Sequence, residues 1–191
     1  MFNRTRKLVA AVVAAACVMT GASAAFAAGS PTKGSTPKAE AVTVESPKGT
    51  DSYQTSADGT AKVTAVNATK TKNATVHSEI VSNNVKYTVT TVATNAFKGQ
   101  KHVKKIYLGR SVVKAEKKAF SGAKKLKKVY VRTAKKFTFK KGAFKGLKTG
   151  KMTVYVNKKM SKKNYKKLVK SLRKAGFKGK IKRYTVKKTA D

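Results

Sequence analysis

The chain has 191 residues, 40% of them hydrophobic, and a formal net charge of +38, from 45 Lys and Arg against seven Asp and Glu. This length gives room for one modest core, so we expect a single folded domain once the ends are set aside. With one cysteine and two histidines, the chain lacks the residues for a disulfide framework, a thiolate metal site or an acid-base centre, so we predict no metal, no cofactor and no enzymatic activity.

The first 27 residues are typical of a secretory signal peptide. Three basic residues precede an apolar run at 8–19, and small residues follow it, as signal cleavage requires. We expect cleavage after Ala27, with Ala24 as the second choice, and therefore a secreted or surface-associated protein that is not integral to the membrane. A lipoprotein-type cut before Cys17 is an alternative, but Ala14 stands where a larger aliphatic residue is usual. An uncleaved anchor is another, because the apolar stretch reaches about twenty residues if small polar residues are tolerated.

Residues 28–60 are predicted to be a flexible linker. They are rich in Ser, Thr, Gly, Lys and Ala, and they hold all three prolines of the chain. A segment without a sustained apolar period cannot bury enough surface to offset the entropy lost on ordering. We therefore place the start of the folded domain at residue 61.

Short strands are predicted between residues 61 and 92. The runs 62–66, 74–76, 80–81 and 85–92 are rich in Val, Thr and Tyr and alternate with period two. Asn83 and Asn84 separate the last two runs, and Asn tolerates the left-handed backbone angles of a turn. This unit leads directly into the repeats, so we interpret it as their N-terminal β cap.

One phrase occurs three times between residues 96 and 156. Ala-Phe-x-Gly begins each copy, and each copy leads to an aliphatic-Tyr-aliphatic triplet centred on Tyr107, Tyr130 or Tyr155. The repeated Phe residues are 23 and then 24 residues apart, which is the period of a stacked repeat protein. We predict a mostly β repeat solenoid over residues 61–156, a short right-handed coil with parallel strands. The phenylalanines should stack inside it: Phe97, Phe120 and Phe144.

A helical cap and a basic tail are predicted for residues 157–191. Apolar residues recur at helical spacing, with Lys on the other faces: Tyr165, Leu168, Val169 and Leu172. Ser161 is suited to cap the start of this helix, and Gly176 follows its end. A helix here would cover the open end of the stack, which otherwise presents unpaired strand edges. Ile181, Tyr184 and Val186 suggest a last extended segment.

The repeats resemble those of the BspA-like leucine-rich-repeat family of bacterial secreted and surface proteins. The resemblance rests on residues 87–97, the three Ala-Phe-x-Gly copies, the L-x-x-I-x-L spacing after them, and the Tyr-Lys-Lys-Leu sequence from Tyr165. It covers roughly residues 61–176. It implies a leucine-rich-repeat fold and a role in surface attachment, adhesion or binding of host and matrix components. The Asn ladder of many leucine-rich repeats is missing, because Ser111, Ala134 and Lys159 stand in its place.

The outward face of the repeated strands is the first candidate binding site. Alternation places aromatic and basic residues together on it: Lys105, Tyr107, Lys128, Tyr130, Arg132 and Tyr155. Aromatic faces flanked by cations can stack on sugar rings or bases and hold an attached anion. The alternative is a structural tyrosine ladder, in which each cross-strand pair contributes about 0.2–1 kcal/mol.

A second candidate is a column of lysines four residues after each repeated Phe: Lys101, Lys124 and Lys148. Copies about 4.8 Å apart would bring such charges close enough to repel by roughly 0.9 kcal/mol even in bulk water. From residue 96 onward the chain has 35 basic residues but only Glu116 and Asp191 as acids. A solvated surface is one interpretation of this excess, and a polyanion partner is the other.

These features favour an exported, non-catalytic binding or adhesion module. Its expected partners are teichoic acid, acidic polysaccharide, glycosaminoglycan or a host surface protein, and no small-molecule substrate is expected. The alternative is a protein that binds extracellular DNA or another biofilm-matrix component, using the same charge and the tyrosines. Disruption of foreign membranes by the C-terminal helix is a third hypothesis, although lysines lie close to its apolar stripe.

Overall fold

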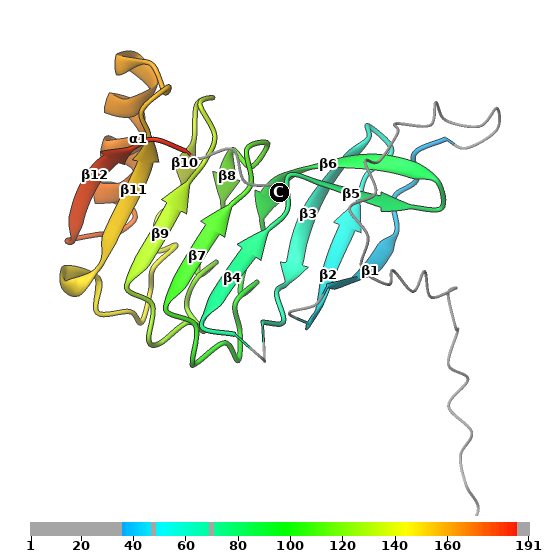
Figure 1. Ribbon diagram of the computed structural model, residues 1–191, viewed down its shortest axis with the longest axis horizontal. Coiled ribbons are helices and arrows are strands. Elements are labelled where there is room, and N and C mark those ends of the chain that lie inside the picture. The colour runs from blue at the N-terminus through cyan, green and yellow to red at the C-terminus, as the bar shows by residue number, and fades with distance from the viewer. Residues whose placement is uncertain (1–35, 47–48, 69–70, 187–191) are drawn as a thin grey trace, which may run out of the picture. The chain divides into compact units, whose positions relative to one another are not determined.

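The computed structural model describes residues 36–46, 49–68 and 71–186, which lie in one compact unit, Pro31–Asp191. The predicted signal peptide, its cleavage sites and Cys17 fall outside the described residues. The fold is mostly β with one α-helix (Figure 1). The strands are β1 (Ala41–Ser46), β2 (Gly49–Thr55), β3 (Thr60–Ala65), β4 (Asn73–Val76), β5 (Glu79–Ser82), β6 (Val85–Val92), β7 (Lys105–Leu108), β8 (Lys114–Ala115), β9 (Lys128–Val131), β10 (Thr138–Phe139), β11 (Thr153–Asn157) and β12 (Lys180–Tyr184); the helices are α1 (Lys162–Lys174) and a 3-10 turn, η1 (Thr149–Lys151).

The strands form two sheets, and from β6 to β11 consecutive strands alternate between them (Figure 1). Sheet A has the order β1-β2-β3-β6-β8-β10, with β5 beside β6, and sheet B has the order β12-β11-β9-β7-β4. Every pair in sheet B is parallel, as are β3-β6, β6-β8 and β8-β10 in sheet A. The first two copies of the repeat therefore contribute one strand to sheet B and the next to sheet A.

The core lies between the two sheets, and its most regular feature is a stack of phenylalanine rings. Phe120 packs against Phe97 at 5.5 Å and against Phe144 at 5.0 Å between ring centroids, with near-parallel planes. All three side chains are buried, as the sequence predicted. In sheet B the aliphatic residues of the triplets are in register and face this stack, so that Ile106 lies beside Val129 and Val129 beside Val154.

The third copy of the repeat ends the stack differently. Lys151 occupies the position of Val103 and Leu126, and Met152 is buried in the core beside it. Helix α1 follows β11, with Ser161 as its N-cap: the Ser161 hydroxyl accepts a hydrogen bond from the Asn164 amide. Leu168 and Leu172 of α1 are buried. The predicted helix is therefore confirmed as α1, and the final extended segment as β12, which ends at Tyr184 and does not include Val186.

The turns of the repeats share one backbone feature. The residue two positions before each repeated Phe has a left-handed backbone, with φ of 59° at Asn95, 58° at Lys118 and 75° at Gly142. Asn83 and Asn84 also have positive φ, as predicted for the turn between β5 and β6. Gly122 is needed for a different reason: a Cβ there would lie 1.9 Å from the carbonyl oxygen of Phe97.

The prediction of a flexible linker over residues 28–60 is wrong for residues 41–46 and 49–55, which form β1 and β2. Strands β1 and β2 form an antiparallel hairpin that joins sheet A through β3, and Tyr53 in β2 is only 1% exposed. Pairing with β3 explains why this segment is structured. The backbone groups of β2 hydrogen-bond to β3, and the core covers the Tyr53 side chain. A composition dominated by Ser and Thr hid a strand that alternates between buried and partly exposed residues.

Candidate ligand-binding surface

The outward face of sheet B brings most of the first group of predicted site residues together. Lys105 pairs in register with Lys128, and Tyr107 pairs with Tyr130. On the next strand Tyr155 continues the tyrosine row, while Thr153 follows the lysines. The aliphatic residues between them point into the core. Period-two alternation in three parallel strands is thus sufficient to align chemically equivalent side chains across the sheet.

The three tyrosines form a tight ladder. The ring centroids of Tyr107 and Tyr130 are 4.6 Å apart, and those of Tyr130 and Tyr155 are 4.7 Å apart, with interplanar angles of 10°. Because β9 lies between β7 and β11, both faces of the Tyr130 ring are covered by its neighbours. A sugar or base cannot stack on Tyr130. What this ring offers to a ligand is its edge and its hydroxyl group.

A fourth tyrosine, which was not among the predicted site residues, closes the ladder. The ring of Tyr184 on β12 meets Tyr130 edge-on at 5.4 Å and Tyr155 at 6.1 Å. Burial raises the pKa of Tyr184 to about 12, against the opposing effect of the Arg132 charge and with a further rise from Tyr130. Burial also raises the pKa of Tyr130, together with the neighbouring Tyr107 and Tyr155. The ladder is therefore a partly desolvated surface.

Arg132 lies in the candidate face but differs from the exposed cation that the sequence suggested. Arg132 is only 6% exposed, and its carbonyl oxygen accepts a 2.7 Å hydrogen bond from Nδ2 of Asn157 on the next strand. Its guanidinium is close enough to Tyr184 to oppose the rise in the pKa of that phenol. Arg132 therefore contributes to the local potential of the ladder more than to its accessible surface.

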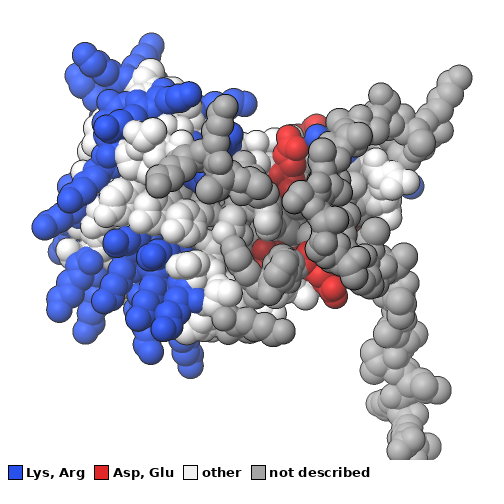
Figure 2. Space-filling model, in the orientation of Figure 1, with Lys and Arg blue, Asp and Glu red and all other residues white. Residues whose placement is uncertain are grey.

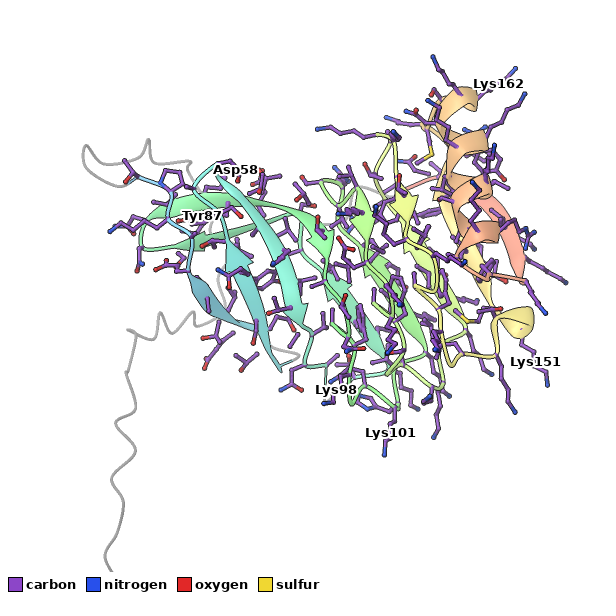
Figure 3. All side chains as sticks on the ribbon, turned by 180° about the vertical axis from the view of Figure 1, so that it is seen from behind. Asp58, Tyr87, Lys98, Lys101, Lys151 and Lys162 are labelled. Carbon is purple, nitrogen blue, oxygen red and sulfur yellow. The ribbon has the colours of Figure 1, made fainter. Side chains whose placement is uncertain are left out.

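The second predicted group lies in the loops that precede the sheet B strands. Lys101, Lys124 and Lys148 are all exposed, and the Lys124 ammonium donates to the carbonyl of Gly146 in the next copy at 3.3 Å. Other exposed lysines surround them. We call this group the lysine edge: Lys98, Lys101, Lys124, Lys125, Lys127, Lys145, Lys148 and Lys151. Lys98, Lys101 and Lys151 are labelled along this border of the molecule in Figure 3.

The lysine edge has no carboxylate partner within the described part of the chain. The ion pairs found there join Lys86 to Glu79 at 3.3 Å and Lys114 to Glu116 at 2.6 Å. Neither involves a lysine of the edge. Figure 2 shows Lys and Arg gathered over the repeats, with the visible acids on the other part of the molecule.

A second basic surface lies on helix α1. Its exposed side chains, which we call the α1 face, are Lys162, Lys163, Lys166, Lys167, Lys170, Arg173 and Lys174. It carries a comparable number of charges to the lysine edge, but they lie on one helix and do not repeat from copy to copy. This face provides a matched comparison for the lysine edge.

The described residues contain no cluster of three or more side chains suited to hold a metal ion. His102 is engaged in a structural contact, since its Nε2 lies 2.6 Å from the carbonyl oxygen of Ala68. Asp51 is buried, and burial raises its pKa, although the Asn67 amide hydrogen bond acts in the opposite direction. No helix in the part of the chain described has the length and apolar character needed to cross a membrane.

Comparisons with known proteins identify no family and give a weak structural similarity. No family model matches the chain, and no curated protein matches it in sequence. Among solved structures, the chain is similar to a leucine-rich repeat protein from Bacteroides capillosus, with 18% identity over 60% of this chain and 97% of that chain, and a TM-score of 0.39. The geometry of sheet B and of the lysine edge therefore carries the functional assignment.

Proposed function

We propose that the chain is an exported, non-catalytic binding module: a short leucine-rich-repeat solenoid whose basic surface binds anionic polymers of the cell envelope, or host glycans and matrix. The alternation of strands between two sheets and the continuous phenylalanine stack support the solenoid. Attachment of a cell or of the protein itself to such polymers would be the physiological result.

The observation that carries the proposal is the lysine edge, which has no carboxylate partner among the described residues. Its eight exposed lysines come from the loops of three stacked copies. Neighbouring copies are one strand spacing apart, about 4.8 Å, so the charge of the edge has a high linear density. Like charges at this spacing repel one another and lower stability. A polymeric anion relieves the repulsion and releases its own counterions, which makes binding favourable.

The salt dependence of binding tests this function. We expect the full-length chain to bind heparin and lipoteichoic acid, with affinities that fall steeply and log-linearly as salt is raised, because each bound anionic group releases a counterion. Binding that is equally strong at low and high salt, or absent at low salt, contradicts the proposal.

The extracellular-DNA alternative uses the same charges, so the salt slope cannot separate it from the first proposal. Competition at fixed salt can. If duplex DNA displaces both heparin and lipoteichoic acid at equal charge concentration, the ligand is nucleic acid. If DNA is the weaker competitor, the envelope or glycan ligand is supported.

A further inference from the structure

We propose that sheet B binds a linear anionic polysaccharide that lies across the strands, along the direction in which the repeats stack. This inference rests on the polyanion-binding function proposed above and adds the class of the polymer and its orientation. Two parallel rows of side chains carry it. The hydroxyl row is formed by the phenol groups of Tyr107, Tyr130 and Tyr155, and the lysine row by Lys105, Lys128 and Lys180 with Thr153 between the last two.

The orientation of the polymer follows from the direction in which equivalent side chains recur on sheet B. Across the strands, the same phenol repeats at 4.6 and 4.7 Å. Along a strand, the outward positions change from Lys to Tyr, and β9 is followed directly by Arg132, which is buried. A polymer with a regular repeat therefore finds equivalent partners only when it crosses the strands. In that orientation one edge of the polymer faces the hydroxyl row and the other faces the lysine row.

The class of polymer follows from which part of the tyrosines is available. Single-stranded nucleic acids are held mainly by stacking of bases on aromatic faces, but both faces of Tyr130 are occupied within the ladder. The phenol hydroxyls can donate and accept hydrogen bonds, which suits the hydroxyl groups of sugars. The lysine row supplies ammonium groups as point charges for carboxylate or sulfate, without the fork geometry of arginine.

The lysine row and the lysine edge adjoin each other, and backbone hydrogen bonds between neighbouring copies hold them together where they meet. The amides of Lys127 and Lys128 donate to the carbonyl of Lys104, and the amide of Thr153 donates to the carbonyl of Lys127. The last residue of each loop is therefore the sequence neighbour of a residue in the row. The lysine edge extends the positive potential of the lysine row. Lys128 also approaches the ring of Tyr155, with its ammonium 6.0 Å from the ring centroid, so charge and hydroxyl rows are close enough to contact one polymer chain.

The decisive variant keeps the ladder and removes its hydroxyls: Tyr107→Phe, Tyr130→Phe and Tyr155→Phe together. Phenylalanine preserves ring stacking, and an unchanged urea midpoint will show that the fold is intact. We expect the affinity for heparin oligosaccharides to fall about tenfold or more, because the variant loses several hydrogen bonds to the sugar. Affinity for inorganic polyphosphate, which offers charge without sugar hydroxyls, should remain within about twofold.

The outcomes separate the inference from the function on which it rests. An unchanged heparin affinity in the triple variant, or an equal loss for heparin and polyphosphate, overturns the polysaccharide assignment while polyanion binding stands. If the parent chain binds neither polymer, the proposed function fails as well. A selective loss of duplex DNA binding in the triple variant would assign the hydroxyl row to nucleic acid instead.

Oligosaccharide length tests the orientation. A chain that lies along the stack gains a phenol on each of β7, β9 and β11 and a lysine on each of β7, β9 and β12. Heparin fragments should therefore bind more tightly with each added disaccharide until they span the sheet. A fragment lying along one strand would reach its full affinity within one or two sugars. Affinity that is already maximal for a disaccharide therefore contradicts the proposed direction.

Discussion

Individual residues show how the ladder acquires its properties. The positions of Tyr107, Tyr130 and Tyr155 could be predicted, because alternation within each strand fixes the face and the repeat fixes the register. The role of Tyr184 could not. It reaches the ladder through β12, which pairs with β11 only after the chain has passed through α1. The sequence predicted an extended segment around Tyr184, but no local spacing encodes the strand with which that segment pairs.

The pKa of Tyr184 gives a prediction at this scale. Its pKa of about 12 in the folded chain lies above the value near 10 expected for an unfolded tyrosine. The folded chain therefore holds this proton more tightly, so the stabilising contribution is complete below about pH 10 and is lost as pH rises toward 12. Spectrophotometric titration of tyrosinate should show a late step that Tyr184→Phe removes.

Tyr53 provides a background for that titration, since burial and the nearby Asp51 carboxylate also raise its pKa. Alkaline unfolding of the Tyr184→Phe variant should be less steep than that of the parent between pH 10 and 12. A late step of unchanged amplitude in the variant would show that Tyr184 is not the desolvated phenol of the ladder.

Among the elements, the repeated turns and the phenylalanine stack were the most predictable part of the fold. Ala-Phe-x-Gly occurs in three copies, and a single copy has no other way to cover its Phe than to stack on the next. The β1-β2 hairpin was the least predictable. Its order depends on pairing with β3 and on the burial of Tyr53, which are tertiary effects that a composition rich in Ser and Thr does not reveal.

The central ring of the stack is the element-scale test. Phe120 is fully buried and contacts Phe97, Phe139 and Phe144. Phe120→Ala should lower the free energy of unfolding by about 3–5 kcal/mol, through lost burial and a cavity that neighbouring copies cannot fill. Urea denaturation measures this change. Val81→Ala is the control, because Val81 is 60% exposed and should cost less than about 0.5 kcal/mol. A comparable loss in the two variants would show that the rings do not join the copies.

For the whole molecule, the distribution of charge could be predicted but the surfaces that it forms could not. Nearly all the excess positive charge lies from residue 96 onward. Only the fold separates it into a lysine edge along the stacked loops and an α1 face on the capping helix. The lysine edge repeats with the copies, and we propose that it serves a repeating ligand at some cost in stability. The α1 face lacks that repeat, which makes it the appropriate control.

The most direct test of this account compares two charge-matched variants of the full-length chain. One replaces Lys101, Lys124 and Lys148 with Gln, and the other replaces Lys162, Lys163 and Lys166 with Gln. At fixed salt, the account predicts that the first variant loses about tenfold or more in heparin affinity and is at least as stable to urea as the parent, because repulsion along the edge is relieved. The second variant should lose clearly less affinity. Equal losses in the two variants, or none in the first, would contradict the claim that the stacked lysines form the polyanion-binding surface.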